Sequence, residues 1–266
     1  MYNLQLLKLI YFWSAHIQIK MKLIHLIILS VLLSAPYFVQ AQQIQTDRPT
    51  ETESTSTISA KHLQMENGIS YEKNGDEKIY EMPEVVLRYG LFKNAEIRME
   101  TAFKISNDES ENLYGIKPVT FGFKYHVIDH KGLAPDIAVL GRLSIPWMAD
   151  NSLQEQNYSP EIRVLFQHEL SKKTHVSYNM GIEWLAENAS PEYIYTLSVD
   201  HAVSKKCKVF IETYGFAVSH EHAENNADAG VLYLLSKNLQ LDFMAGTSLM
   251  NAHPKKFAEI GLSFKI

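Results

Sequence analysis

The chain has 266 residues, of which 46% are hydrophobic and 21% charged, and its formal net charge is −5. Its single cysteine, Cys207, excludes an intramolecular disulfide and with it the small disulfide-stapled class of exported proteins. The negative balance argues against nucleic acid as a partner, because phosphate neutralisation requires clustered Lys and Arg.

The N-terminus predicts an export signal. Met21-Lys22 precedes an apolar run from Leu23 to Leu33, and the small residues Val39 and Ala41 stand just before an expected cut ahead of Gln42. We therefore expect residues 1–41 to be a signal peptide, with Met21 as the true translation start. No lipobox cysteine stands at this cut, so a lipid anchor is not expected.

A polar segment, residues 42–59, separates the signal from the first periodic stretch. Its most site-like element is Asp47-Arg48-Pro49, a charged pair followed by a rigid proline. These three residues could fold into the protein as a plug or constriction, and a solvated N-terminal tail is an equally open alternative.

From residue 60 to residue 266 the hydrophobic pattern has a period of two, which is typical of strands with one apolar and one polar face. Twelve such stretches can be counted, although the alternation is less clean over residues 206–217 and 229–235. No run of about 18 apolar residues follows the signal, so a transmembrane helix is excluded. A membrane location would therefore require a β-barrel.

The connections between the stretches alternate in length. Four short ones share an apolar residue, a spacer, Lys, and then Lys or Asn, and they begin at Leu91, Leu170, Val203 and Leu235. Longer acidic connections are expected between them, at residues 106–113, 149–159 and 219–228. Short turns at one end and long loops at the other are typical of bacterial outer-membrane barrels. The predicted fold is all-β, a single antiparallel up-and-down transmembrane barrel of about twelve strands with short periplasmic turns.

Alternation alone does not say which face meets lipid. Burying the many Tyr and Trp side chains in a soluble core would require a partner for each polar atom, whereas aromatic girdles at the membrane interfaces need none. We therefore expect the apolar face to point outward. A soluble periplasmic β-barrel binding protein with inverted faces remains the alternative.

With the apolar face outward, the lumen receives charges of both signs. Each could rigidify a narrow barrel through ion pairs or line a permeation path. The lumen candidates are Glu66, Arg88, Glu96, Arg98, Glu100, Lys124, Arg142, Glu212 and Asp242.

Metal-dependent and catalytic functions have weak support. His220-Glu221-His222 offers two imidazoles without a third fixed ligand, so no metal site is predicted. No nucleophile-elbow glycine pattern surrounds a serine, and His168, the best outward-facing histidine, has no obvious serine beside it. The chain is expected to be neither an enzyme nor a cofactor-binding protein.

Several short motifs occur in an order that resembles one exported family, labelled as a putative meta-pathway phenol-degradation protein and often called a transporter. The motifs are Thr46-Asp47-Arg48-Pro49, Leu87-Arg88-Tyr89-Gly90-Leu91, Glu96-Ile97-Arg98, Phe121-Gly122-Phe123-Lys124, Tyr178-Asn179-Met180-Gly181 and Asn238-Leu239-Gln240-Leu241-Asp242. This resemblance implies an outer-membrane transporter or channel for small organic, including aromatic, compounds.

A structural or interaction barrel with a closed lumen is the alternative function. The expected partners are outer-membrane lipid, the outer-membrane assembly machinery and a small organic substrate.

Overall fold

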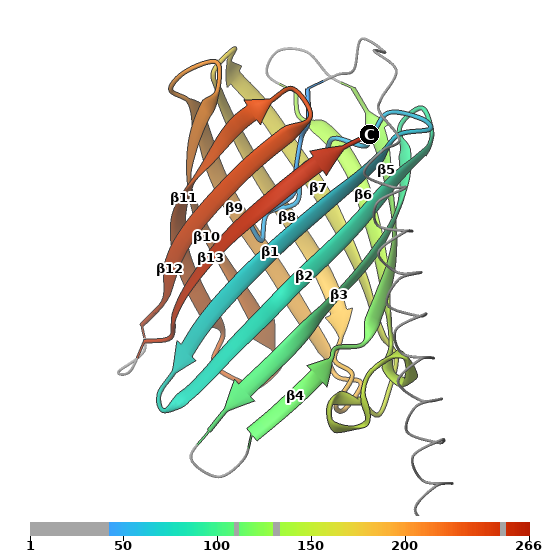
Figure 1. Ribbon diagram of the computed structural model, residues 1–266, viewed down its shortest axis with the longest axis vertical. Helices are drawn as coiled ribbons and strands as arrows, with labels where there is room; N and C mark the ends of the chain where they lie inside the picture. Colours follow the sequence, from blue (N-terminus) through green and yellow to red (C-terminus); the bar gives the residue numbers. More distant parts are fainter. Residues whose placement is uncertain (1–42, 109–111, 130–133, 251–253) are drawn as a thin grey trace, which may run out of the picture. The chain divides into compact units, whose positions relative to one another are not determined.

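The protein folds into a closed antiparallel β-barrel (Figure 1). The structure is a computed structural model that describes residues 43–108, 112–129, 134–250 and 254–266; the expected signal peptide lies outside these residues. The strands are β1 (Leu63–Asn74), β2 (Glu77–Phe92), β3 (Ala95–Asn107), β4 (Asn112–Ile116), β5 (Val119–Ile128), β6 (Asp136–Ile145), β7 (Ser159–Ser171), β8 (Thr174–Trp184), β9 (Pro191–Ala202), β10 (Cys207–Val218), β11 (Glu224–Ser236), β12 (Leu239–Leu249) and β13 (Lys256–Lys265).

The thirteen labelled strands occupy twelve positions around the barrel wall. Strands β4 and β5 pair in succession with β3, so they form one wall position interrupted at Lys117-Pro118. Proline has no N–H to give to a ladder, which explains an interruption at this point. The remaining strands pair with their neighbours in sequence, and pairing of β1 with β13 closes the ring. The predicted twelve-stranded antiparallel barrel is confirmed.

Apolar side chains cover the outside of the wall and polar ones its inside. On β3 the outward Ile97 is 43% exposed, whereas its neighbours Glu96 and Arg98 are buried. On β5 the outward Phe123 and Tyr125 flank Lys124, which is fully buried. A water-soluble barrel would show the opposite arrangement, so the exterior is built for lipid contact.

The predicted tight turns occur at one end of the barrel, where β13 also ends. Lys93-Asn94 joins β2 to β3 and Lys237-Asn238 joins β11 to β12. Asn94 has a φ of 70°, a left-handed conformation that Asn tolerates better than most residues.

Two of the predicted long connections are shorter than expected. Strand β3 extends to Asn107, and β11 begins at Glu224, so residues 224–228 belong to the wall. The connection from β6 to β7 is long, and it contains two short 3-10 helices, Pro146–Met148 and Asn151–Leu153. No helix in the described ranges is long and apolar enough to cross a membrane.

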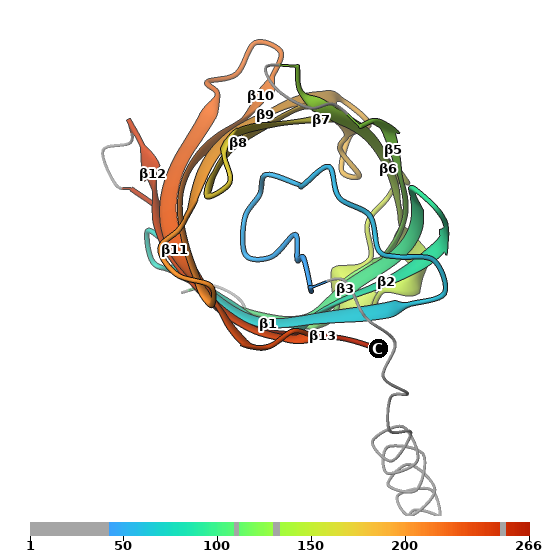
Figure 2. The same cartoon turned by 90° about the horizontal axis from the view of Figure 1, so that it is seen from above.

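Residues 43–59, which we call the lumen segment, run inside the barrel before the chain enters β1. Figure 2 shows this segment as an irregular blue loop within the ring of strands. Ile44 N–H donates to the Lys237 carbonyl at 2.8 Å, which ties the start of the segment to the β11–β12 turn. Ile44 and Ile58, near its two ends, are 2% and 5% exposed.

Candidate functional site: the lumen segment and its cavities

Wall side chains hold the backbone of the lumen segment. An irregular chain inside a protein has no ladder partner, so each of its buried N–H groups must find another acceptor. Glu66 on β1 accepts from Asp47 and Arg48 N–H, and Glu212 on β10 accepts from Glu51 and Thr52 N–H. Two further wall side chains accept from N–H groups of the segment: Asn179 on β8 accepts from Glu53 N–H at 2.7 Å, and Glu96 on β3 accepts from Ile58 N–H at 2.7 Å.

An ion-pair cluster joins the segment to β2, β3 and β5. Asp47 Oδ2 lies 2.9 Å from Arg88 Nη1 and 2.6 Å from Lys124 Nζ. Glu53 Oε2 lies 2.6 Å from Arg98 Nη1 and 3.1 Å from the same Lys124 Nζ. All five side chains are at most 7% exposed. Removing one partner from a buried pair leaves an uncompensated charge, so substitution of any one of these five side chains should loosen the lumen segment.

The protonation state of Glu53 reflects this environment. Burial on its own would raise the pKa of Glu53, but Arg98, Lys124 and Arg142 outweigh that effect and hold the pKa well below its usual range. Glu53 is therefore a carboxylate at neutral pH, with its charge directed at the three wall cations.

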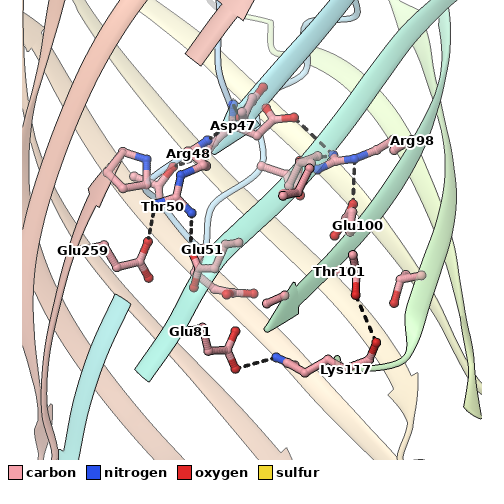
Figure 3. Close-up of a pocket in the computed structure, with 18 of the residues that line it drawn as sticks. Asp47, Arg48, Thr50, Glu51, Glu81, Arg98, Glu100, Thr101, Lys117 and Glu259 are labelled. Atoms are coloured by element: carbon pink, nitrogen blue, oxygen red, sulfur yellow. Dashed lines mark hydrogen bonds and ion pairs between the residues drawn. The ribbon is translucent and has the colours of Figure 1, made fainter. Parts of the chain in front are cut away.

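Arg48 extends from the segment in a different direction, toward β1, β2 and β13. Its guanidinium pairs with Glu84 and with Glu259, the latter at 3.1 Å (Figure 3). Asp242 lies 3.9 Å away on β12. The guanidinium occupies the space that a side chain at Gly68 would fill. The absence of a side chain at Gly68 therefore leaves room for Arg48.

Cavities lie on both sides of the lumen segment. The outer cavity, toward the β1–β2 and β3–β4 connections, has a volume of about 380 Å³ and is lined by Glu81, Glu84, Glu100 and Lys117 among others. The inner cavity, toward the short turns, has a volume of about 420 Å³ and is lined by serines and by Lys205, Lys206 and Lys208. Arg48 and Thr50 line both cavities, which places these two residues at the division between them.

The two cavities differ in charge. Carboxylates outnumber cations among the residues that line the outer cavity, whereas Asp200 is the one acidic residue among the described side chains of the inner cavity. The formal charge of the lining residues is thus net negative in the outer cavity and net positive in the inner cavity.

Aromatic side chains form a strip on the lumen face of β10 that the sequence analysis missed. Phe210 lines the inner cavity, Tyr214 lines the outer cavity, and Phe216 lines a third cavity of about 300 Å³. The Tyr214 ring lies 5.7 Å from that of Phe216 and 6.3 Å from that of Phe257 on β13. In the sequence, the alternation of apolar and polar residues is irregular over residues 206–217. The irregularity arises because aromatic residues share the inner face with Glu212.

The lumen candidates named from the sequence all lie on the inner face, in three groups. Glu66, Arg88, Glu96, Arg98, Lys124 and Glu212 contact the lumen segment directly. Arg142 pairs both with Glu53 of the segment, at 3.4 Å, and with Glu100, at 3.3 Å; Arg142 and Glu100 also line the outer cavity, and Asp242 lies beside Arg48. Asp47, Arg48 and Pro49 line the outer cavity, and Pro49 is buried at the turn of the segment.

The other residues that the sequence analysis weighed lie elsewhere. His168 stacks on Tyr178, with Nε2 3.3 Å from the Tyr178 hydroxyl. His220, Glu221 and His222 are exposed in the connection between β10 and β11.

Comparison with known proteins supports the architecture. The crystal structure of the COG4313 outer membrane channel from Pseudomonas putida F1 superimposes with a TM-score of 0.63 at 11% identity, covering 82% of this chain and 100% of that one. The NanC porin gives a TM-score of 0.56 at 9% identity over 76% and 100% of the two chains. The KdgM porin gives 0.53 at 10% identity over 75% and 98%. At these identities the likeness shows a shared fold.

No curated protein matches the chain in sequence. A family match covers residues 46–266, which include most of the lumen segment and the whole barrel. The chain belongs to the family described as "Putative MetA-pathway of phenol degradation".

Proposed function

We propose that this protein is an outer-membrane channel for small aromatic compounds, closed to ions at rest by the lumen segment. The observation that carries the proposal is the aromatic strip on β10, because its residues line cavities on both sides of the segment. Flat apolar rings offer contact to an aromatic solute along a path that is otherwise polar and charged. The family description, which names phenol degradation, supports the same class of solute.

In this proposal the lumen candidates have two roles. Asp47, Arg48 and Pro49 form the plug, and the wall charges that pair with the segment hold it in place. The carboxylates of the outer cavity tune selectivity. Because they outnumber the cations there, neutral solutes such as phenol enter more readily than an anion such as 4-hydroxybenzoate.

Uptake of radiolabelled phenol at low concentration, by cells with and without the protein, tests this function. Expression of the wild type raises the initial rate, and Phe210→Ala and Tyr214→Ala each reduce that gain several-fold. Ile211→Ala is the matched control, because Ile211 lies between them on β10 and faces outward at 64% exposure. Heat-dependent gel mobility confirms that each variant folds.

Two outcomes contradict the proposal. In the first, cells that express the wild-type protein take up phenol no faster than cells without it. That result would favour a structural barrel with a closed lumen. If both aromatic variants take up phenol as fast as the wild type, the aromatic strip does not line the permeation path.

A further inference from the structure

A histidine and two aspartates converge at the short-turn end of the barrel, away from the aromatic strip. His126 lies near the end of β5, Asp129 follows that strand, and Asp136 begins β6. One ligand atom from each of the three lies within 4.8 Å of the others. The register between β5 and β6 shifts at Val127, so a bulge separates His126 from the residues that follow it.

The orientation of His126 suits metal binding. Its Nδ1 lies 2.8 Å from the carbonyl oxygen of Thr55 in the lumen segment. A carbonyl can only accept, so Nδ1 carries the proton, and in the neutral ring Nε2 keeps its lone pair. Metal-bound histidines commonly show this arrangement, with one nitrogen on the ion and the other donating to a carbonyl or carboxylate.

The donor set indicates the class of ion. One imidazole and two carboxylates bring two negative charges, which a divalent cation neutralises, and imidazole favours first-row transition metals over Ca²⁺. Zinc bonds to nitrogen and oxygen are about 2.0–2.2 Å long and tetrahedral, so two ligands of one ion lie about 3.4 Å apart. Asp129 is exposed, so its side chain has room to rotate toward the ion.

We propose that His126, Asp129 and Asp136 bind a divalent first-row transition-metal ion, and that the bound ion strengthens the attachment of the lumen segment through Thr55. A cation on Nε2 withdraws electron density from the ring and makes Nδ1–H a stronger donor. The ion would thus tighten the contact between the wall and the segment without touching the segment itself.

The test uses untagged full-length protein in detergent and Zn²⁺ as the probe, with competition against a chromophoric chelator. We expect one Zn²⁺ per chain, with His126→Ala, Asp129→Asn and Asp136→Asn each weakening its affinity at least about tenfold. The matched control is His175→Ala, because His175 also lies near a short turn, with Nδ1 3.0 Å from one carboxylate, Asp200. A double His220→Ala/His222→Ala variant reports on the exposed loop histidines.

Several results would overturn the site: no Zn²⁺ bound by the wild type, full affinity in His126→Ala, or equal losses in His175→Ala or in the loop double variant. Hydrogen exchange of residues 54–57 tests the coupling. We expect Zn²⁺ to slow it several-fold in the wild type and not in Asp129→Asn, whose exposed position leaves the fold intact. Zinc binding with unchanged exchange would overturn the link to the lumen segment.

Discussion

Single residues inside the barrel make contacts that their sequence neighbourhood does not reveal. Asp47 and Arg48 stand out as a charged pair before a proline, whereas Glu53 sits in a run of Thr, Ser and Glu without periodicity. Only the folded barrel brings Glu53 to Arg98 and Lys124, which lie 45 and 71 residues further along the chain. A sequence pattern reports which face a residue occupies, not which residue lies across the lumen.

Glu53→Gln should loosen the lumen segment while the barrel stays folded. The substitution removes a negative charge from a cluster with three cations, and breaking a buried pair in this way costs about 3–5 kcal/mol. Protease cleavage or hydrogen exchange within residues 43–59 should increase strongly. Glu187→Gln, in an exposed connection, is the control and should change nothing. Protection as in the wild type would show that Glu53 does not hold the segment.

The lowered pKa of Glu53 predicts the pH range in which acid loosens the lumen segment. A carboxylate whose pKa is lower in the folded state stabilises that state above its unfolded pKa of about 4.3 and loses this contribution as pH falls through the folded value. The contribution of Glu53 to protection of the segment should therefore be constant from about pH 7 to pH 5 and fall only in stronger acid. Release between pH 5 and pH 7, followed by hydrogen exchange, would assign control to a different group.

Gly68 offers a test of the Arg48 contact. A methyl group at this position would collide with the guanidinium, which lies at the free end of a flexible side chain and can move aside. Gly68→Ala should therefore leave the barrel folded, displace Arg48 from Glu84 and Glu259, and raise ion conductance in planar bilayers. Gly141→Ala is the control, because the nearest atom to a methyl group there is 3.9 Å away. Equal conductance in the two variants would count against Arg48 as a constriction.

At the scale of elements, alternation located the strands well wherever outward residues are large and apolar. It placed the beginning of β11 too late, because the outward residues there, Ala227 and Ala229, are small and the inward ones, Asn226 and Asp228, are polar. The path of the lumen segment could not be predicted, since side-chain acceptors rather than a ladder hold its backbone. The tight turns were predictable because they repeat.

The turn between β2 and β3 should be sensitive to side-chain shape. Asn94 has a positive φ, and a β-branched residue in that conformation costs about 1–2 kcal/mol. Asn94→Val should lower the urea midpoint of unfolding, whereas Asn94→Gly should not. Equal midpoints for Val and Gly would mean that the turn relaxes to another conformation.

At the scale of the whole molecule, the barrel has an apolar exterior, a charged interior and an irregular segment that divides its lumen into cavities of opposite charge. The sequence predicted the apolar exterior and the lumen charges from a period of two together with the many Tyr and Trp side chains, which fit membrane interfaces better than a soluble core. It left open whether residues 42–59 lie inside or outside, because a polar segment is compatible with water and with a polar lumen alike. The contacts of Arg48, Asp47 and Glu53 with the wall distinguish the two positions in the structure.

The most direct test of the closed channel is single-channel conductance of the wild type and of a variant lacking residues 43–59, both refolded and inserted into planar bilayers. The arrangement predicts little or no current through the wild type and a several-fold larger, stable current through the deletion variant. Equal conductance of the two proteins would contradict a lumen closed by this segment.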